Sequence, residues 1–291
     1  MLDNGIFRLY YANTTGKQRY RNRQNPGKKR KAHTMKKILA LLLALTMIFS
    51  LAACSGGSSG SETWEDELGT KGKLRVGMAA DYPPYESYDA AGNVVGLDAD
   101  IAQMIADELG VELEIVPMEF DTIISAVTAG TVDMGISCFS YTDERAKSVL
   151  FTETYMTSAQ CCFASTEYGI NAMEDLDGGL VGAGNGTTGM EVAEALAPEY
   201  GFTTQPGEIA VMSESVKSGA MQAIITEQCV ADSYIAANPG KFQMIAEDLT
   251  VEEIKAITNM NNDKLQAKVD EIIKAFVATD AYSELVVKWF D

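Results

Sequence analysis

The chain has 291 residues and a formal net charge of -18, from 23 basic and 41 acidic side chains. Residues 1–37 hold 11 of the basic residues and one acidic residue, whereas the chain from Cys54 onward holds 12 basic and 40 acidic residues. A body this acidic cannot neutralise phosphates over an extended surface, which argues against nucleic acid as a partner. Hydrophobic residues make up 46% of the chain, enough for a core, and residues 54–291 suit one large or two small domains.

An uncharged stretch of sixteen residues, 38–53, follows Met35-Lys36-Lys37. This is short for a membrane-spanning helix, which needs about 20 residues, and a positive start before a short apolar stretch is typical of an export signal. The stretch ends in Leu51-Ala52-Ala53-Cys54, which resembles the lipobox of bacterial lipoproteins. The resemblance implies a signal peptide over residues 35–53 and a lipid on the thiol of Cys54. A buried cysteine after a plain membrane anchor is the alternative.

Serine and glycine alone make up residues 55–61, so a flexible tether is expected over residues 54–63. Residues 1–34 fit no part of an exported protein, and we interpret them as an over-long gene model with Met35 as the true start. His33 is the only histidine. The exported body is therefore expected to lack imidazole catalysis and most zinc chemistry.

The body opens with alternating strand and helix patterns. Apolar residues at helical spacing run from Ile101 to a stop at Gly110, and apolar residues alternate with glutamates from Val111 to Ile115. In chain order we predict strand, helix, strand, helix and strand over residues 74–78, 101–110, 111–115, 123–130 and 132–137. Connections this short imply a parallel sheet with helices on its faces.

The pattern restarts in the second half of the body. We predict a strand, a helix and a strand over residues 180–183, 189–197 and 222–226, then a helix that ends before Asn238. A last helix carries an apolar stripe, made of Leu265, Val269, Ile272, Ile273, Phe276 and Val277. Two successive α/β units predict an α/β protein of two lobes. Ligands of open α/β sheets bind beyond the carboxyl ends of the strands, so the cleft between the lobes is the expected site.

Two arginines occur from Cys54 onward, Arg75 and Arg145. Arg75 lies within a predicted strand and is expected to point to solvent. Arg145 follows the third predicted strand and a segment that contains small hydroxyl side chains. A guanidinium at a strand end suits a carboxylate ligand, because it can hold both oxygens at once. The alternative is a surface ion pair with Asp143 or Glu144.

A glycine-rich turn over residues 182–189 joins a predicted strand to a predicted helix. Backbone amides and the helix dipole at such a turn attract an anion. Residues 184–189 also satisfy G-x-G-x-x-G, and Glu208 follows about 20 residues later, as in a dinucleotide site. A dinucleotide-binding fold therefore remains a competitor. No lysine follows the glycines, which excludes a phosphate-binding P-loop.

Tyr82-Pro83-Pro84-Tyr85 follows the first predicted strand, and proline stiffens the loop so that aromatic faces can cover an apolar stem or a cation. Tyr85 fits the edge of the core equally well. Asp98 and Asp100 begin a predicted helix, where capping is a better explanation than a catalytic pair.

The cysteines after Cys54 are Cys138, Cys161, Cys162 and Cys229, and their spacing matches no metal motif. We interpret them as small buried apolar residues, although the sequence leaves their pairing open. No metal and no cofactor are expected.

Together the motifs resemble the extracellular solute-binding proteins of ABC amino-acid importers, the polar amino-acid class. The resemblance runs from about Leu74 to Lys288-Trp289-Phe290 and rests on motifs in matching order: Tyr82-Pro83-Pro84-Tyr85, Val95-Gly96-Leu97-Asp98-Ala99-Asp100, Thr142-Asp143-Glu144-Arg145 and Gly186-Thr187-Thr188. It implies a two-lobed periplasmic-binding-protein-like fold of type II, with two crossover strands between the lobes. Lobe 1 is expected over residues 64–157 and 250–291, and lobe 2 over residues 158–249.

The resemblance also implies which residues bind a free amino acid. Arg145 holds the α-carboxylate with help from Ser140 and Thr188, and Glu227 takes the α-ammonium. Aromatic rings at Tyr82 and Phe120 cover the side-chain stem. The full expected set is Tyr82, Phe120, Ser137, Cys138, Ser140, Arg145, Gly186, Thr187, Thr188 and Glu227.

The sequence departs from the family pattern at three positions, two of which belong to this set. Glu227 stands where an aspartate is usual, so its reach differs by one methylene, and a solvated acid at a helix start is the alternative. Cys138 replaces the usual glycine or serine. Ala79 replaces an acid that many members carry, which favours a neutral ligand over a cationic one.

The preferred interpretation is a monomeric receptor, anchored by lipid at Cys54 on the cell surface or in the periplasm, that delivers an amino acid to an ABC permease. It carries out no reaction. The resemblance extends to exported cyclohexadienyl dehydratases, so an enzyme with Glu227 as general acid is the alternative. A dinucleotide-dependent enzyme is the third interpretation.

Overall fold

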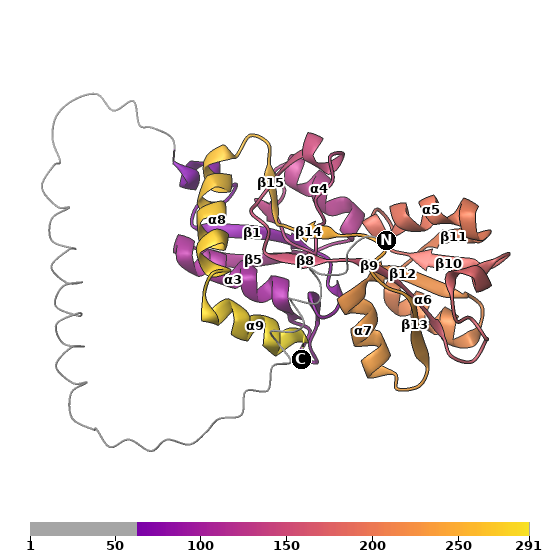
Figure 1. Ribbon diagram of the computed structural model, residues 1–291. Helices are drawn as coiled ribbons and strands as arrows, with labels where there is room; N and C mark the ends of the chain where they lie inside the picture. The colour runs from indigo at the N-terminus through magenta and orange to yellow at the C-terminus, as the bar shows by residue number, and fades with distance from the viewer. Residues whose placement is uncertain (1–62, 291) are drawn as a thin grey trace, which may run out of the picture. The chain divides into compact units, whose positions relative to one another are not determined.

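Two five-stranded sheets organise the part of the chain that the computed structural model describes, residues 63–290 (Figure 1). The expected gene-model extension, the signal peptide, Cys54 and nearly all of the tether lie outside these residues. Within them, no helix has both the length and the apolar character needed to cross a membrane.

The first sheet has the strand order β5-β1-β6-β15-β7. Its strands are β1 (Lys73–Met78), β5 (Glu112–Pro117), β6 (Met134–Gly135), β7 (Val149–Phe151) and β15 (Ile257–Asn259). β1 runs parallel to β5 and β6, whereas β15 runs antiparallel to β6 and β7. The parallel part of this sheet confirms the prediction from the first strand and helix pattern.

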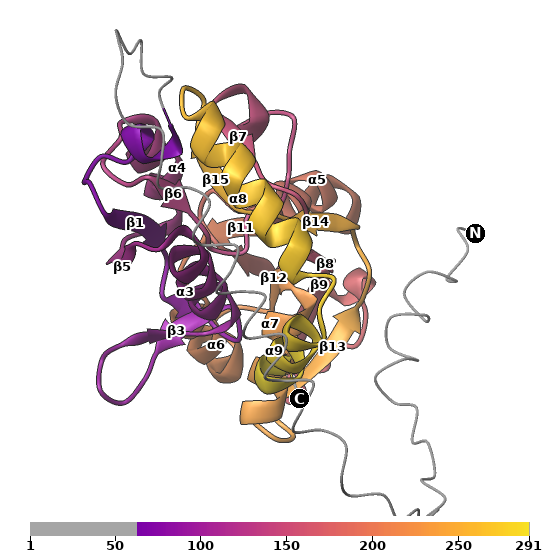
Figure 2. The same ribbon diagram turned by 90° about the vertical axis from the view of Figure 1, so that its left-hand side faces the viewer.

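Helices α3 (Leu97–Leu109), α4 (Phe120–Thr128), α8 (Asp263–Phe276) and α9 (Asp280–Phe290) belong to this lobe (Figures 1 and 2). The predicted apolar stripe of α8 is buried at Leu265, Val269 and Ile272. α3 ends as expected, because Gly110 adopts φ 70° and its N–H returns to the carbonyl oxygens of Ala106 and Asp107.

The second sheet has the strand order β11-β10-β12-β9-β13. Its strands are β9 (Gln160–Ser165), β10 (Leu180–Ala183), β11 (Thr203–Pro206), β12 (Ala223–Glu227) and β13 (Phe242–Ala246). Helices α5 (Thr188–Tyr200), α6 (Ile209–Ser218) and α7 (Gln228–Ala237) pack on it. β10 is parallel to β11 and β12, and β9 is antiparallel to β12 and β13.

The chain passes between the two sheets twice. The first passage contains β8 (Met156–Ser158) and the second contains β14 (Glu252–Ile254), and these two strands pair antiparallel. Two α/β lobes joined by two crossover strands are therefore confirmed. A hairpin sheet of β2 (Asp81–Tyr82), β3 (Glu86–Tyr88) and β4 (Val94–Val95) follows β1.

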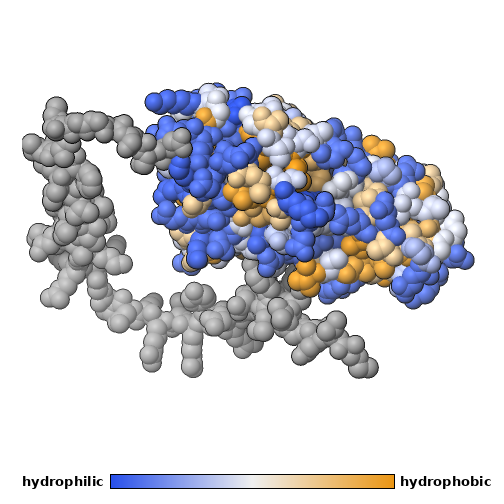
Figure 3. Space-filling model, turned by 90° about the horizontal axis from the view of Figure 1, so that it is seen from above, coloured by the Kyte–Doolittle hydropathy of each residue, from blue (hydrophilic) through white to orange (hydrophobic). Residues whose placement is uncertain are grey.

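Buried hydrophobic residues form three clusters, and the largest continues from the first lobe into the second, from Leu74 and Ile105 to Phe163 and Ile224. The two lobes thus share packed apolar surface. On the face seen in Figure 3, hydrophilic residues predominate and hydrophobic ones gather in smaller patches.

Two expectations about the first lobe are wrong. Arg75 does not point to solvent, because its guanidinium donates to both carboxylate oxygens of Asp133 at 2.7 and 3.1 Å and to the carbonyl oxygen of Thr131 at 2.6 Å. The predicted strand over residues 132–137 contains only two residues of β6. Its ladder is short because the chain turns at Cys138, which adopts φ 47°.

Candidate functional site

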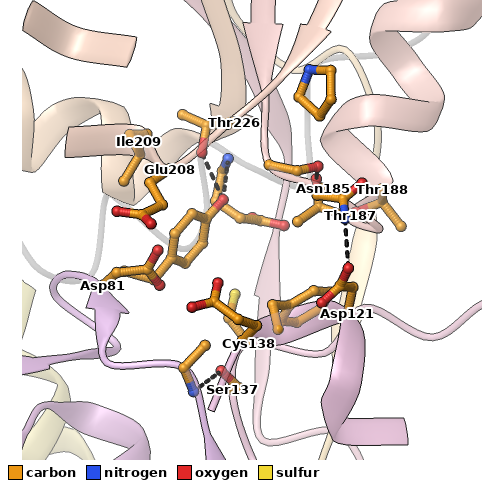
Figure 4. A pocket seen from close by; sticks show the side chains of 18 of the residues that line it. Asp81, Asp121, Ser137, Cys138, Asn185, Thr187, Thr188, Glu208, Ile209 and Thr226 are labelled. Carbon is orange, nitrogen blue, oxygen red and sulfur yellow. Dashed lines mark hydrogen bonds between the residues drawn. The ribbon is translucent and has the colours of Figure 1, made fainter. Parts of the chain in front are cut away.

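A cavity of about 430 Å³ lies between the two lobes. Its lining includes almost every residue that the sequence indicated, namely Tyr82, Phe120, Ser137, Cys138, Ser140, Arg145, Thr187, Thr188 and Glu227. Gly186 does not line it, but its carbonyl oxygen accepts a hydrogen bond from Arg145. Figure 4 shows the labelled side chains reaching the cavity from both lobes.

Arg145 begins the short helix η2 (Arg145–Lys147), just after the turn that follows β6, and only 8% of it is exposed. Its Nη1 donates to the carbonyl oxygen of Ser140 at 2.8 Å, and its Nη2 donates to that of Gly186 at 2.9 Å. Since a guanidinium has five N–H groups, donors remain for a carboxylate. The proposed surface ion pair is wrong, because Glu144 pairs with Lys147 instead.

The environment of Arg145 leaves the guanidinium charged and able to bind an anion. The guanidinium lies over the rings of Phe120 and Phe139, 5.4 and 5.6 Å from their centroids. Burial lowers the pKa of Arg145 from its usual value, and the carboxylates of Glu191 and Glu252 oppose that shift. The two carbonyl contacts and the rings hold the side chain without neutralising it.

The second lobe meets Arg145 with the turn between β10 and α5. Thr187 caps the helix, because its side chain accepts from the N–H of Met190 and its hydroxyl donates to the carbonyl oxygen of Gly184 at 2.8 Å. An added Cβ at Gly189 would lie 2.8 Å from Oε1 of Gln160 and 3.1 Å from the carbonyl oxygen of Ile225, so a larger residue would displace a neighbour. The start of a helix favours an anion, as the sequence predicted for this turn.

Ser140 and Thr188 have a partner that the sequence did not indicate. Both hydroxyls donate to Oε2 of Glu252, with Thr188 at 2.9 Å. These bonds occupy both hydroxyls in the structure, and their expected role as donors to a ligand carboxylate stays a prediction. The sequence does not distinguish Glu252 from its neighbour Glu253. The pairing of β14 with β8 buries Glu252 and leaves Glu253 exposed.

Glu227 ends β12 and is 2% exposed, so the alternative of a solvated acid at a helix start is wrong. Its Oε1 accepts from Nε2 of Gln160 at 2.8 Å, whereas its Oε2 has no hydrogen-bond partner among the described residues. Burial and the nearby carboxylate of Glu252 raise the pKa of Glu227 well above its usual value. A buried acceptor without a donor on a cavity wall fits a cationic ligand group.

The two aromatic residues have different surroundings. The hydroxyl of Tyr82 lies 2.6 Å from Oγ1 of Thr226 and accepts from the N–H of Glu227 at 3.2 Å, so it connects the lobes. The ring of Phe120 stacks on that of Phe139 with centroids 4.6 Å apart. Tyr85 is fully buried against Phe290, which confirms its place in the core.

Ser137 and Cys138 are held by two buried acids, one of which, Glu86, also lines the cavity. The hydroxyl of Ser137 donates to Oε1 of Glu86 at 2.6 Å, and the N–H of Cys138 donates to Oδ2 of Asp98 at 2.6 Å. Asp98 is therefore not a helix cap, since Gly96 occupies the N-cap position of α3. Burial raises the pKa of the Cys138 thiol, which is unpaired.

Comparisons with known proteins agree with this geometry. Residues 74–291 match the bacterial extracellular solute-binding proteins, family 3. The chain belongs to this family. Its relatives include the arginine-binding extracellular protein ArtP of Bacillus subtilis, 34% identical over 258 residues, which cover 88% of this chain and 98% of ArtP. A probable histidine-binding protein of Campylobacter jejuni is 29% identical over 88% of this chain and 99% of its own.

Solved structures share the fold of this solute-binding protein. An ancestral arginine-binding protein bound to arginine has a TM-score of 0.72 and 31% identity, covering 76% of this chain and 99% of its own. The ancestral amino acid-binding protein AncCDT-1, a precursor of cyclohexadienyl dehydratase, has a TM-score of 0.69 and 32% identity, covering 76% and 96%. The expected two-lobed binding-protein fold is thereby confirmed. The glycine-rich turn belongs to its second lobe, not to a dinucleotide-binding fold.

The solute-binding protein also has an acidic side to its cavity, which the sequence analysis missed. Asp81 lines this side from the first lobe and Glu208 from the second, and Glu86, Glu119 and Asp121 also line the cavity. Figure 4 shows Asp81 and Glu208 on the same side of the cavity, opposite Asp121 and Asn185. Burial, followed by the charges of Glu208 and Glu119, raises the pKa of Asp81 to about 6. These acids were not recognisable because they are adjacent only after the lobes meet.

Proposed function

We propose that this protein is the ligand-capturing component of an ABC importer and that it binds a free amino acid between its lobes. Arg145 and the start of α5 receive the α-carboxylate, and Glu227 receives the α-ammonium. The side chain lies by Tyr82 and Phe120. Closure is favoured by the difference in the ligand's affinity for the closed and open states.

The observation that carries the proposal is the unpaired Oε2 of Glu227 on the wall of the same cavity that Arg145 lines. A buried carboxylate and a guanidinium that are not paired with each other match the two charges of a zwitterion. Relatives described as binding arginine, histidine or cystine support the same ligand class.

We further propose that the ligand carries a cationic side chain. Ala79 favoured a neutral ligand at the level of the sequence, but the acidic side of the cavity changes that balance. Asp81, Glu119 and Glu208 line the cavity, whereas Arg145 is the one basic residue among the described residues in its lining. A cation beside Asp81 relieves the repulsion between these carboxylates.

A thermal-shift panel of the free L-amino acids on residues 62–291 tests the function, because a ligand that binds the folded state raises the unfolding temperature. We expect arginine, lysine or ornithine to give the largest shifts. A panel without any shift contradicts amino-acid binding. Larger shifts with glutamine or leucine than with any basic amino acid contradict only the cationic preference.

Catalysis is the second candidate, because the protonated form of a buried Glu227 resembles a general acid. The acidic lining of the cavity disfavours prephenate, which has two carboxylates and no ammonium. Incubation with prephenate and with arogenate decides the matter, since product formation from either would establish an enzyme.

The remaining proposals concern the anchor and the division of the chain. We propose lobe 1 over residues 64–157 and 250–291, lobe 2 over residues 158–249, and a monomer tethered to the membrane by lipid on Cys54. Replacing Cys54 by serine is expected to release the protein into the medium or the soluble periplasm. Retention of the variant in the membrane contradicts the lipid anchor.

A further inference from the structure

Two buried carboxylates meet at one side-chain amide at the inner wall of the cavity. Nε2 of Gln160 donates to Oε1 of Glu227 at 2.8 Å and lies 3.3 Å from Oε2 of Glu252. Glu227 is 2% exposed and Glu252 is 8% exposed. Glu227 lines the cavity, whereas Glu252 lies behind it on the crossover strand β14.

The surroundings of Glu252 favour its ionised form. Its Oε2 accepts from Ser140, Thr188 and Gln160, and its Oε1 accepts from Oγ1 of Thr250 at 3.0 Å. Burial alone would raise the pKa of Glu252, but hydrogen bonds from Glu227 and from these donors hold it below its usual value. Four donors from both lobes and a crossover strand therefore stabilise one negative charge.

Glu227 has the opposite surroundings. Its Oε2 has no hydrogen-bond partner in the part of the chain that the structure describes, and burial together with the charge of Glu252 outweighs the opposing effect of the Ser158 and Ser140 hydroxyls and favours its protonated form. The titratable and charged groups that act on the pair, taken from every element around it, are Tyr82, Tyr85, Cys138, Arg145, Cys161 and Cys229. Among these neighbours Arg145 is the sole cation, and its N–H groups are directed to the carbonyl oxygens of Ser140 and Gly186.

We propose that Glu227 and Glu252 share one proton and that the α-ammonium group of the bound amino acid displaces it. This inference rests on the proposed function. The carboxylic acid of Glu227 loses its proton to solvent, the ligand keeps the three protons of its ammonium group, and the pair then holds two negative charges beside one positive charge. Glu252 is a positioning residue, because it acts on the ligand through Glu227.

Proton release on binding makes the affinity depend on pH in one direction. Because binding expels a proton, the affinity rises with pH, by up to about tenfold per pH unit while the free protein is protonated at the pair. It becomes independent of pH once the free pair has lost its proton. A site with a single ionised carboxylate shows no such rise.

Titration calorimetry of residues 62–291 in buffers of different ionisation enthalpy, between about pH 5 and about pH 8, measures the released protons directly. L-glutamine is used with the unaltered chain and L-arginine with Asp81→Asn, because a cationic side chain beside Asp81 would release a second proton. The described part of this fragment forms one compact unit. We expect release of close to one proton at the acidic end, falling toward zero at the alkaline end. Binding without release throughout this range overturns the proposal.

Three variants test whether the released proton comes from the pair of Glu227 and Glu252. Glu227→Gln and Glu252→Gln are expected to abolish proton release, because each leaves one carboxylate. Glu253→Gln is the matched control, since Glu253 lies next on β14 and pairs with Lys255. It is expected to release protons as the wild type does. Unchanged release in Glu252→Gln overturns the role of Glu252.

A measurement on the protein without ligand keeps the two proposals distinct. Carbon-13 titration of the glutamate carboxyl groups, with the signal of Glu227 assigned from Glu227→Gln, is expected to show a raised pKa for Glu227 that moves toward the usual value in Glu252→Gln, whereas the raised pKa of buried Glu86 stays. If neither amino acid binds, the proposed function fails, and this titration alone decides whether the pair exists. A free protein in which Glu227 titrates normally overturns the shared proton.

Discussion

Nη2 of Arg145 donates to the carbonyl oxygen of Gly186 at 2.9 Å, although the two residues belong to different lobes. The same guanidinium is anchored to its own lobe through the carbonyl oxygen of Ser140 at 2.8 Å. One side chain therefore connects the turn before α5 to the segment between β6 and η2. On the proposed function, binding of a ligand and closure of the lobes depend on the same group.

Replacing Arg145 by alanine should abolish ligand binding while the protein stays folded. Loss of a buried, hydrogen-bonded charge that faces a ligand carboxylate costs on the order of 2–5 kcal/mol. Arg145→Lys keeps the charge but loses the planar fork, so a large part of the loss should remain. Calorimetry with the best ligand of the panel measures both effects.

Lys147→Ala is the control for this pair of variants, because Lys147 lies in the same short helix and is paired at the surface with Glu144. Its affinity should equal that of the wild type. An Arg145→Ala protein that binds normally removes Arg145 from the site.

Replacing Tyr82 by phenylalanine should weaken binding by favouring the open state. The variant keeps the ring but loses the contact with Thr226 and the hydrogen bond from the N–H of Glu227. A loss of about 1 kcal/mol, or roughly fivefold in affinity, is expected. Small-angle scattering should detect a larger radius of gyration in the variant. Tyr88→Phe, on the exposed hairpin, should change neither quantity, and equal effects of the two substitutions contradict the role of Tyr82.

Asp81 should make the preference for a basic amino acid depend on pH. Its pKa is raised to about 6, so the carboxylate that attracts a cation is lost as the pH falls below this value. The ratio of arginine to glutamine affinity should therefore decrease between neutral pH and pH 5, and Asp81→Asn should show the low ratio at all pH values. Asp89→Asn, on the same hairpin and bonded to Asn93, should behave as the wild type. A ratio that is constant in the wild type argues against Asp81.

The same residue should affect the stability of the free protein. The folded state holds the proton of Asp81 between its usual pKa of 3.8 and about 6, whereas the unfolded chain has lost it. Stability therefore falls as the pH rises through this window, and Asp81→Asn should be more stable than the wild type at neutral pH. Urea unfolding at several pH values measures the difference, and a variant that is less stable than the wild type at neutral pH contradicts it.

Replacing Asp98 by alanine should destabilise the fold. The N–H of Cys138 would lose a buried acceptor that lies 2.6 Å away, at a cost of about 1–3 kcal/mol. Asp98→Asn retains an acceptor oxygen and should recover much of that loss. Asp107→Ala, on the exposed face of the same helix, should change the free energy of unfolding little. An Asp98→Ala protein as stable as this control rules out a structural role for the contact.

Features that depend on local order along the chain were predictable. Strand and helix periods predicted both α/β units, and the position of Arg145 after a strand predicted a charged group at the cleft. The turn before Thr188 and the acid at Glu227 followed from the order of the family motifs. Strand ends converge in any open α/β sheet, so their residues can be assigned to a site without coordinates.

Features that depend on register and on lobe packing were not predictable. Arg75 was expected to point to solvent but donates to Asp133, and Asp98 was expected to cap a helix but accepts from the N–H of Cys138. In both cases the partner comes from a segment that is distant along the chain. Glu252 was indistinguishable from Glu253 until β14 paired with β8. The sequence by itself determined the two-lobed fold and many of the residues that line the cleft, although not its acids Asp81, Glu119 and Asp121. Only the tertiary structure decided which of them share donors, because the burial and charge of a side chain depend on atoms that are distant along the chain.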